Sequence, residues 1–307
     1  SMINLIRSNR DANFPWLGVF IGSSVIGFWY WCTDQFIVQR VLSGKDETQA
    51  RRGAIFGAYL KLTPVFLFLI PGMVAFAMQK HGITVNGETF TMSSADAAFP
   101  TLVAKLLPAG FKGLVVCGIL AALMSSLASL FNSSAMLFTI DFYKKYRPKA
   151  SEKTLLYVGR VATVVVVVLG ILWIPVMKSV GSVLYNYLQD VQSVLAPGIA
   201  AAFLLGICSK KATPKGGMWG LIAGFKYLFY DTNWLFFCGG MLLFCMLVIV
   251  VVSRFTTPAP AEQIVGLTFG STTDEQKAVT RASWNKWDVI HSAIIILITV
   301  VFYWYFW

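Results

Sequence analysis

Several polar side chains of this sequence lie inside long apolar runs, where they can contact a solute. Lys61 lies in GAYLKLTPVFLFLIPG, near the middle of the second long apolar run. An ammonium group at that depth of a bilayer costs about 2.5–3.5 kcal/mol on insertion scales. It is expected to line a polar cavity, and snorkelling of the side chain to the interface is the alternative. Pro64 and Pro71 predict a bend or an interruption in the same helix.

A second polar group lies in LAALMSSLASLFNSSA, residues 120–135. Its hydroxyl and amide side chains are Ser125, Ser126, Ser129, Asn132, Ser133 and Ser134. Small residues of this kind allow close helix packing, which is one interpretation. The other is a cation site, because a hard ion such as Na⁺ prefers hydroxyl and carbonyl oxygens.

A third group lies in VLYNYLQDVQSVLAPGIAA, residues 183–201. Asn186, Gln189 and Ser193 share one helical face, and Tyr185, Gln189 and Gln192 form an overlapping face. Amides, phenols and a lysine exchange hydrogen bonds with hydroxyls, and aromatic rings cover the apolar C–H faces of a pyranose. The combination suits a sugar. Interhelix packing is the alternative for Asn186 and Gln192.

The fourth group is FWYWCTDQFIVQR, residues 28–40. Small residues precede it and predict a broken helix at Gly22, Ser23, Ser24 and Gly27. Tyr30 and Trp31 would project just beyond that break. Phe28 or Trp29 is expected to make an ordinary lipid or helix contact. The role of Asp34 is left open by the pattern. Pairing with a basic residue is one interpretation, with the partner expected in the part of the transporter that precedes this chain.

The elements that position these groups are predicted to be membrane helices. Of the 307 residues, 57% are hydrophobic and 13% charged, and the mean hydropathy is +0.68. About 20 apolar residues cross the hydrocarbon of a bilayer. The apolar runs predict spans near 15–38, 53–78, 110–141, 154–177, 182–208, 216–229, 233–253 and 287–307. The sixth has only about ten apolar residues before Lys226, which predicts a re-entrant segment or missing residues near 224–230.

The formal net charge of +11 is explained by the loops. Basic and weakly basic loops alternate, so the first, third, fifth and seventh loops are predicted to be cytoplasmic and both termini to lie outside. A nucleic-acid partner is not needed. The segment SMINLIRSNRDANFPW has no secretory signal, so earlier membrane spans are expected to be missing from this chain.

Catalysis is not indicated. His81 and His291 are the only histidines, and no nucleophile–base pair or metal cluster is visible. The cysteines lack metal spacing and are expected to be small buried residues: Cys32, Cys117, Cys208, Cys238 and Cys245. The chain is therefore predicted not to be an enzyme.

Long motifs resemble the sodium/glucose cotransporter family. They are FWYWCTDQFIVQRVLSGKDETQARRGAIFGAYLKLTPVFLFLIPGM, FPTLVAKLLPAGFKGL, LMSSLASLFNSSAMLFTIDFY, RPKASEKTLLYVGR and LQDVQSVLAPGIAAAFLLGI. They occur in order over about residues 14–224. The resemblance implies an all-α polytopic protein with part of a leucine-transporter-type inverted-repeat fold. Residues 1–230 would form the second repeat, and 231–307 the C-terminal accessory helices with a cytoplasmic loop near 254–286.

The resemblance also implies roles for single residues. Tyr30 and Trp31 would line a sugar site, and Tyr30 would help close its inner side. Lys61 and Gln189 would hydrogen-bond sugar hydroxyls, and Tyr185 would stand at the outer gate. A sodium site would take oxygens from Ala122, Ser125 and Ser126. Gly27 departs from a polar residue common in the family, and Asn186 replaces an acidic residue of animal relatives.

The implied function is sodium-coupled symport of a glucose- or galactose-like sugar by alternating access. The protein would be a multi-pass protein of the plasma membrane, with Na⁺, a sugar and the lipid bilayer as partners. Two alternatives remain open. In the first, a symporter of the same kind carries an inositol, an amino acid or a vitamin acid. In the second, the protein is a non-transporting sensor or a sodium leak pathway.

Overall fold

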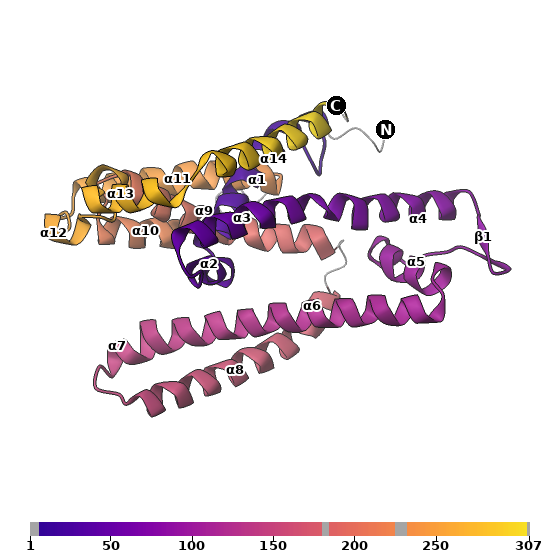
Figure 1. Ribbon diagram of the computed structural model, residues 1–307, viewed down its shortest axis with the longest axis horizontal. Helices are drawn as coiled ribbons and strands as arrows, with labels where there is room; N and C mark the ends of the chain where they lie inside the picture. Colours follow the sequence, from indigo (N-terminus) through magenta and orange to yellow (C-terminus); the bar gives the residue numbers. More distant parts are fainter. Residues whose placement is uncertain (1–5, 180–183, 225–231, 306–307) are drawn as a thin grey trace. The chain divides into compact units, whose positions relative to one another are not determined.

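The computed structural model describes residues 6–179, 184–224 and 232–305, and helices dominate these ranges (Figure 1). Contacts divide the chain into two compact units. One comprises Ser1–Tyr59 and Tyr185–Trp307, and the other comprises Leu60–Leu184. We describe each unit by itself.

The first unit holds the helices at both ends of the chain. They are α1 (Trp16–Phe28), α2 (Gln35–Leu42), most of α3 (Glu47–Leu62), α9 (Leu184–Cys208), α10 (Pro214–Gly224), α11 (Trp234–Arg254), α12 (Ala261–Ile264), α13 (Asp274–Ser283) and α14 (Lys286–Tyr305). A π-helical turn, η1 (Trp29–Thr33), follows α1, and a short 3₁₀ turn, η5 (Phe269–Ser271), precedes α13.

The second unit holds the middle of the chain. Its elements are the π-helical turn η2 (Val65–Leu69), α4 (Ile70–Lys80), β1 (Thr84–Val85), β2 (Glu88–Thr89), the 3₁₀ turn η3 (Ala95–Ala97), α5 (Ala98–Leu106), α6 (Ala109–Met136), the π-helical segment η4 (Leu137–Tyr143), α7 (Lys144–Tyr146) and α8 (Glu152–Ser179). The strands form an antiparallel hairpin whose Asn86–Gly87 turn has positive φ at both residues, as a tight hairpin turn requires.

Seven helical segments of the described residues are long and apolar enough to cross a membrane. They are Trp16–Thr33, Glu47–Lys80, Ala109–Tyr146, Glu152–Met177, Leu184–Cys208, Trp234–Arg254 and Lys286–Tyr305. These segments match seven of the eight predicted spans. The sixth prediction, 216–229, falls on α10, whose 11 residues extend only about 16 Å. The remainder of that prediction lies outside the described residues.

Small residues let the helices of the first unit pack closely. Ala196 and Ala200 of α9 lie fully buried against Val25 and Ile26 of α1 and Cys238 of α11. Around this cluster, the larger side chains that pack on it are Phe28, Trp29, Trp234 and Leu242. The predicted helix contact of Phe28 or Trp29 is therefore confirmed. A second cluster continues along α9 and α11 and is formed by Ala201, Phe237, Met241, Cys245 and Ile249.

The predicted burial of the cysteines is only partly right. Cys238 and Cys245 are buried, but Cys32, Cys117 and Cys208 are exposed. The prediction took an apolar neighbourhood in the sequence to mean a protein interior. A membrane helix also has apolar surface that faces lipid or other helices, so small apolar residues in a span need not be buried in the chain itself.

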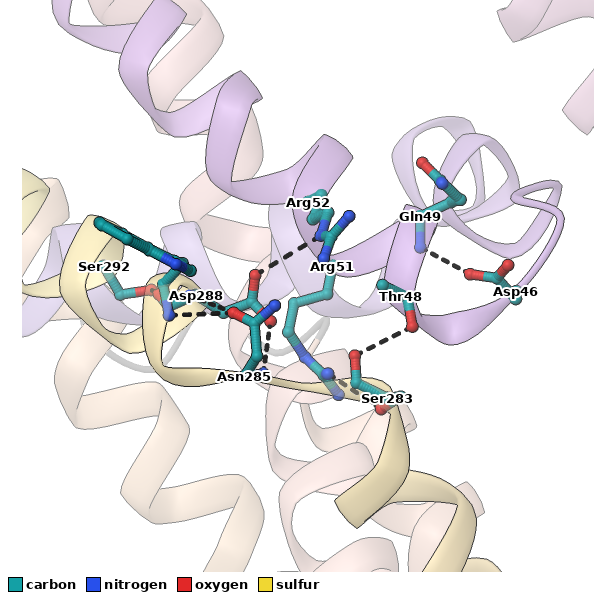
Figure 2. Close-up of polar contacts among 10 residues, drawn as sticks. Asp46, Thr48, Gln49, Arg51, Arg52, Ser283, Asn285, Asp288 and Ser292 are labelled. Atoms are coloured by element: carbon teal, nitrogen blue, oxygen red, sulfur yellow. Dashed lines mark hydrogen bonds and ion pairs between the residues drawn. The ribbon is translucent and has the colours of Figure 1, made fainter.

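A polar seam joins the start of α3 to the segment between α13 and α14 (Figure 2). Thr48 donates its hydroxyl to the carbonyl oxygen of Ser283 at 3.0 Å, and Arg51 donates to the Ser283 hydroxyl at 2.9 Å. Arg52 Nε lies 3.8 Å from a carboxylate oxygen of Asp288, which is only 7% exposed. These contacts fix the first turns of α3 within its unit.

Asp288 and Asn285 cap α14 reciprocally. The Asn285 side-chain oxygen accepts the N–H of Asp288 at 3.2 Å, and the Asp288 carboxylate accepts the N–H of Asn285 at 3.0 Å. This is a capping box built from Asn and Asp. This capping box was not predicted, although the N-x-x-D spacing at the start of an apolar run was a usable signal.

Replacing Asp288 by Ala should destabilise the first unit by about 1–2 kcal/mol, because the backbone N–H of Asn285 loses its partly buried acceptor and Arg52 loses its partner. Asp288→Asn is the matched control, since its side-chain oxygen still accepts from Asn285. Thermal unfolding in detergent, followed by tryptophan fluorescence, should rank the midpoints as wild type, Asp288→Asn and then Asp288→Ala. Equal midpoints for Asp288→Ala and wild type would contradict the role of this carboxylate.

Candidate functional site

The helix containing Tyr30 is interrupted later than the sequence predicts. α1 runs without a break through Gly22, Ser23, Ser24 and Gly27. The interruption is the π-helical turn η1, which ends at Asp34 in an extended conformation. The prediction of a break at the small residues is therefore wrong. Gly22 serves packing instead, because a Cβ there would meet the backbone of Leu235 in α11.

Asp34 restarts the helix. Its carboxylate accepts the N–H of Phe36 at 3.1 Å, so it is the N-cap of α2. Thr33 donates its hydroxyl to the carbonyl oxygen of Trp29 at 2.7 Å and supports the preceding turn. The expected pairing of Asp34 with a basic residue is not among the ion pairs of the described residues. Capping explains why an acidic residue lies at this break.

Tyr30 and Trp31 lie together in this interruption. Their ring centroids are 5.4 Å apart with planes at 90°, an edge-to-face pair of favourable geometry. Tyr30 is half-buried and Trp31 is 47% exposed. The turn thus presents one phenol hydroxyl beside an exposed indole face, which is the chemistry predicted for a sugar contact.

Lys61 lies at the end of α3, in the second unit, where its side chain is exposed. The residues after it form a second interruption. The hydroxyl of Thr63 bonds the carbonyl oxygen of Leu60 at 2.7 Å, and Pro64 leads into η2. Pro71 lies at the start of α4. The prediction of a bent or interrupted helix at the prolines is confirmed.

The predicted cation ligands lie on α6. Ala122, Ser125 and Ser126 are exposed, and their spacing places them on one face of the helix. Ser133, by contrast, is buried and donates to the carbonyl oxygen of Leu130 at 3.0 Å. The hydroxyl run therefore divides into a packing part near Ser133 and an exposed part near Ser125.

Gln189 and Tyr185 are joined directly on α9. The Gln189 amide nitrogen donates to the Tyr185 hydroxyl at 2.8 Å. The Gln189 side-chain oxygen is buried, and among the described residues it has no hydrogen-bond partner. A buried acceptor without a donor costs free energy unless a ligand or water satisfies it. Ser193, on the same helix, is buried and bonds the carbonyl oxygen of Asp190 at 2.7 Å, so it serves packing.

The predicted site residues therefore fall into two sets. Tyr30, Trp31, Tyr185 and Gln189 belong to the first unit, where α1 and α9 pack on a common core. Lys61, Ala122, Ser125 and Ser126 belong to the second unit. Direct side-chain contacts join Tyr30 to Trp31 and Gln189 to Tyr185. The unsatisfied acceptor of Gln189 is a feature that the sequence alone did not show.

Residues 1–224 match the family model of the sodium:solute symporter family. The chain belongs to the sodium:solute symporter family. The resemblance drawn from the motifs is thereby confirmed. With seven candidate spans, this symporter-family chain is an all-α, multi-pass protein of the plasma membrane.

Three curated relatives show how far the similarity extends. Human "Sodium/glucose cotransporter 4" is 39% identical over 298 residues, covering 87% of this chain and 44% of the relative. Bos taurus "Sodium/mannose cotransporter SLC5A10" is 35% identical, covering 99% and 58%. Human "Sodium/myo-inositol cotransporter 2" is 42% identical, covering 72% and 34%. The chain thus spans between about a third and somewhat more than half of the length of these relatives.

Proposed function

We propose that this chain is part of a sodium-coupled symporter for a glucose- or galactose-like sugar, and that it is not an enzyme. The observation that carries the proposal is the buried side-chain oxygen of Gln189, which has no hydrogen-bond partner within the described ranges. The adjacent amide nitrogen donates to Tyr185, and the side-chain oxygen itself needs a hydrogen-bond donor. A sugar hydroxyl supplies that donor. The edge-to-face pair of Tyr30 and Trp31 supplies aromatic surface in the same unit.

Lys61 is also proposed to hydrogen-bond sugar hydroxyls, and Tyr185 is the proposed outer gate. An ammonium donates up to three hydrogen bonds to hydroxyl oxygens and accepts none, which suits a polyhydroxylated substrate. Tyr30 is proposed to close the inner side of the site. Relatives named for glucose, mannose and myo-inositol support a polyhydroxylated substrate.

The co-transported ion is proposed to be Na⁺, held in part by α6. The carbonyl oxygen of Ala122 and oxygens of Ser125 and Ser126 are uncharged, hard ligands on one helix face. Three residues on one helix provide an incomplete shell, so further ligands must come from other parts of the transporter. The relatives named as sodium cotransporters support this choice of ion.

Alternating access provides the coupling in this proposal. Na⁺ must bind the outward-open form more tightly than the inward-open form, because a ligand with equal affinity for both shifts nothing. The π-helical turn η1 contains Tyr30, and η2 begins shortly after Lys61. Helix segments can bend at such turns without losing the whole hydrogen-bond ladder. Residues 1–230 are proposed to be the second inverted repeat of a leucine-transporter-type fold, and 231–307 the accessory helices.

Uptake into proteoliposomes containing the full-length protein tests this function. Labelled glucose or galactose should accumulate with an inward Na⁺ gradient and not when choline replaces Na⁺. An inside-negative potential of about 100 mV adds about 2.3 kcal/mol per charge, which sets an additional limit of about fiftyfold accumulation for one coupled Na⁺. Equal uptake in Na⁺ and choline would contradict the proposal.

A second candidate is the same symporter carrying another solute. The relatives named for mannose and myo-inositol favour other polyols, and the cation of Lys61 would suit an anionic amino acid or vitamin acid. Competition by unlabelled mannose, myo-inositol and a carboxylate panel separates these substrates. Substrate-evoked current without accumulation would instead indicate a sensor or a leak pathway.

A further inference from the structure

The hairpin formed by α6, η4, α7 and α8 ends in a strongly basic turn, residues 144–153. α6 and α8 pack side by side in the second unit, and the turn joins them at one end (Figure 1). Five of its ten residues are basic and only Glu152 is acidic: Lys144, Lys145, Arg147, Lys149 and Lys153. All five basic side chains are exposed, and none takes part in an ion pair within the described ranges.

The backbone of this turn is ordered by its own hydrogen bonds. The N–H of Arg147 donates to the carbonyl oxygen of Tyr143 at 2.8 Å, and the N–H of Ala150 donates to that of Arg147 at 3.0 Å. Ser151 accepts the N–H of Thr154 at 3.3 Å and starts α8. The basic side chains therefore project from a defined scaffold and not from a long flexible loop.

An apolar slot lies between the helices directly beneath the turn. It has a volume of about 370 Å³ and is lined from both sides, including Phe138 and Tyr143 of η4 and Tyr157, Val161 and Val165 of α8. Tyr143 and Tyr157 are the lining residues nearest the turn in the sequence, and the valines continue along the apolar helix. The slot thus begins at the charged end of the hairpin and extends along the membrane-spanning part.

Exposed aromatic side chains surround the same end. Tyr146 is 84% exposed, and Phe142 and Tyr157 are also largely exposed. Aromatic residues gather where membrane helices meet the headgroup region. Basic loops gather on the cytoplasmic side, where anionic lipids give the membrane a negative surface potential. The basic side chains, the exposed aromatic side chains and the mouth of the slot therefore lie at the same end of the hairpin, where the headgroup region is expected.

We infer that the basic turn and the slot form one binding site for an anionic phospholipid of the cytoplasmic leaflet. Its phosphate groups lie among Lys144, Lys145 and Arg147, and one acyl chain occupies the slot between η4 and α8. The basic side chains have no ion-pair partner in the part of the chain that the structure describes, and they lie at the mouth of an apolar slot. Diffuse attraction to a membrane surface would not require the slot, and a soluble phosphate compound has no acyl chain to occupy it.

Lipid binding to the purified full-length protein in neutral detergent tests the site, with native mass spectrometry as the readout. The probes are phosphatidylinositol 4,5-bisphosphate, phosphatidylserine, phosphatidylcholine and soluble inositol 1,4,5-trisphosphate. A basic residue near an anionic lipid surface contributes about five- to sixfold in affinity. The triple variant Lys144→Gln, Lys145→Gln and Arg147→Gln should therefore bind the anionic lipids about a hundredfold more weakly, with helical circular dichroism unchanged.

The matched charge control is Lys210→Gln, Lys211→Gln and Lys215→Gln, which removes the same charge from another predicted cytoplasmic loop. It should keep affinity within about threefold, and an equal loss in both triples would overturn the site in favour of diffuse attraction.

Val161→Trp fills the slot and should weaken lipid binding at least tenfold, whereas Val164→Trp, on the same helix but outside the slot, should not. Inositol trisphosphate binding as tight as the lipid, together with no effect of Val161→Trp, would reduce the site to a phosphate site and overturn the inference.

Discussion

Gln189→Ala in the full-length transporter is expected to raise the sugar concentration for half-maximal Na⁺-dependent uptake by about ten- to a hundredfold. The side-chain oxygen of Gln189 is the buried acceptor left open by the Tyr185 contact. A hydrogen bond between this oxygen and a substrate hydroxyl is worth about 1–3 kcal/mol when its loss leaves a buried group unpaired. The measurement is the sugar dependence of initial uptake rates in proteoliposomes at saturating Na⁺.

Tyr185→Phe and Gln189→Glu separate the two ends of the amide in this experiment. Tyr185→Phe removes the hydroxyl that holds the amide nitrogen but leaves the oxygen, so it should cost less than Gln189→Ala. Gln189→Glu retains an acceptor of the same length and should recover part of the sugar affinity. The Na⁺ dependence should stay near wild type in all three, because the proposed cation ligands lie on α6. Unchanged sugar affinity in Gln189→Ala would remove this residue from the site.

The sequence predicted the spans well because hydrophobic length is a local property. Seven of the eight predicted spans correspond to long apolar helices, and the prolines near Lys61 coincide with an interrupted helix. The motifs also identified the family, which the comparison of residues 1–224 confirmed. A run of apolar residues and a proline act on their own segment, so neither requires knowledge of the partner helix.

The position of the break near Tyr30 shows where local reasoning fails. A segment with two glycines and two serines, residues 22–27, can either break a helix or allow close contact with another helix. Which of the two occurs depends on the helix that packs against it. In the structure Gly22 packs against the backbone of Leu235, which lies more than 200 residues later in the chain. The glycine therefore serves a close helix contact, and α1 continues through it without a break. The break occurs instead at Asp34, whose capping bond to Phe36 is local and whose spacing was readable. The burial of cysteines failed for the same reason, since it depends on which helix face meets another helix.

The sequence allowed the residues of the proposed site to be chosen, but it did not allow the contacts between their side chains to be predicted. Tyr30, Trp31, Tyr185 and Gln189 were chosen for their chemistry and for the family resemblance. The edge-to-face geometry of the first pair and the single hydrogen bond of the second depend on rotamers that a sequence does not specify. The open acceptor of Gln189 follows from those rotamers, and it is what turns a polar residue in a span into a specific proposal.

Gly22→Ala is expected to destabilise the first unit by about 3 kcal/mol. A Cβ at Gly22 would lie 2.8 Å from the Cα of Leu235 and still closer to its carbonyl oxygen. Those are backbone atoms of α11, which cannot rotate away as a side chain does. Relief requires separation of α1 from α11 along the cluster that contains Val25, Ala196 and Cys238. Overpacking of a close helix contact typically costs 1–3 kcal/mol, and a backbone neighbour places this change at the upper end.

Gly27→Ala provides the matched control, because it adds the same methyl group to the same helix with no atom within 4 Å of the new Cβ. It should stabilise the protein by up to about 1 kcal/mol, since alanine restricts the unfolded chain and favours helix. The two variants therefore predict opposite signs for one chemical change, measured as thermal unfolding midpoints in the same detergent. Equal midpoints would mean that α1 does not approach α11 closely at Gly22. Opposite shifts would establish that this glycine positions the helix leading to Tyr30 and Trp31 by close packing and not by breaking it.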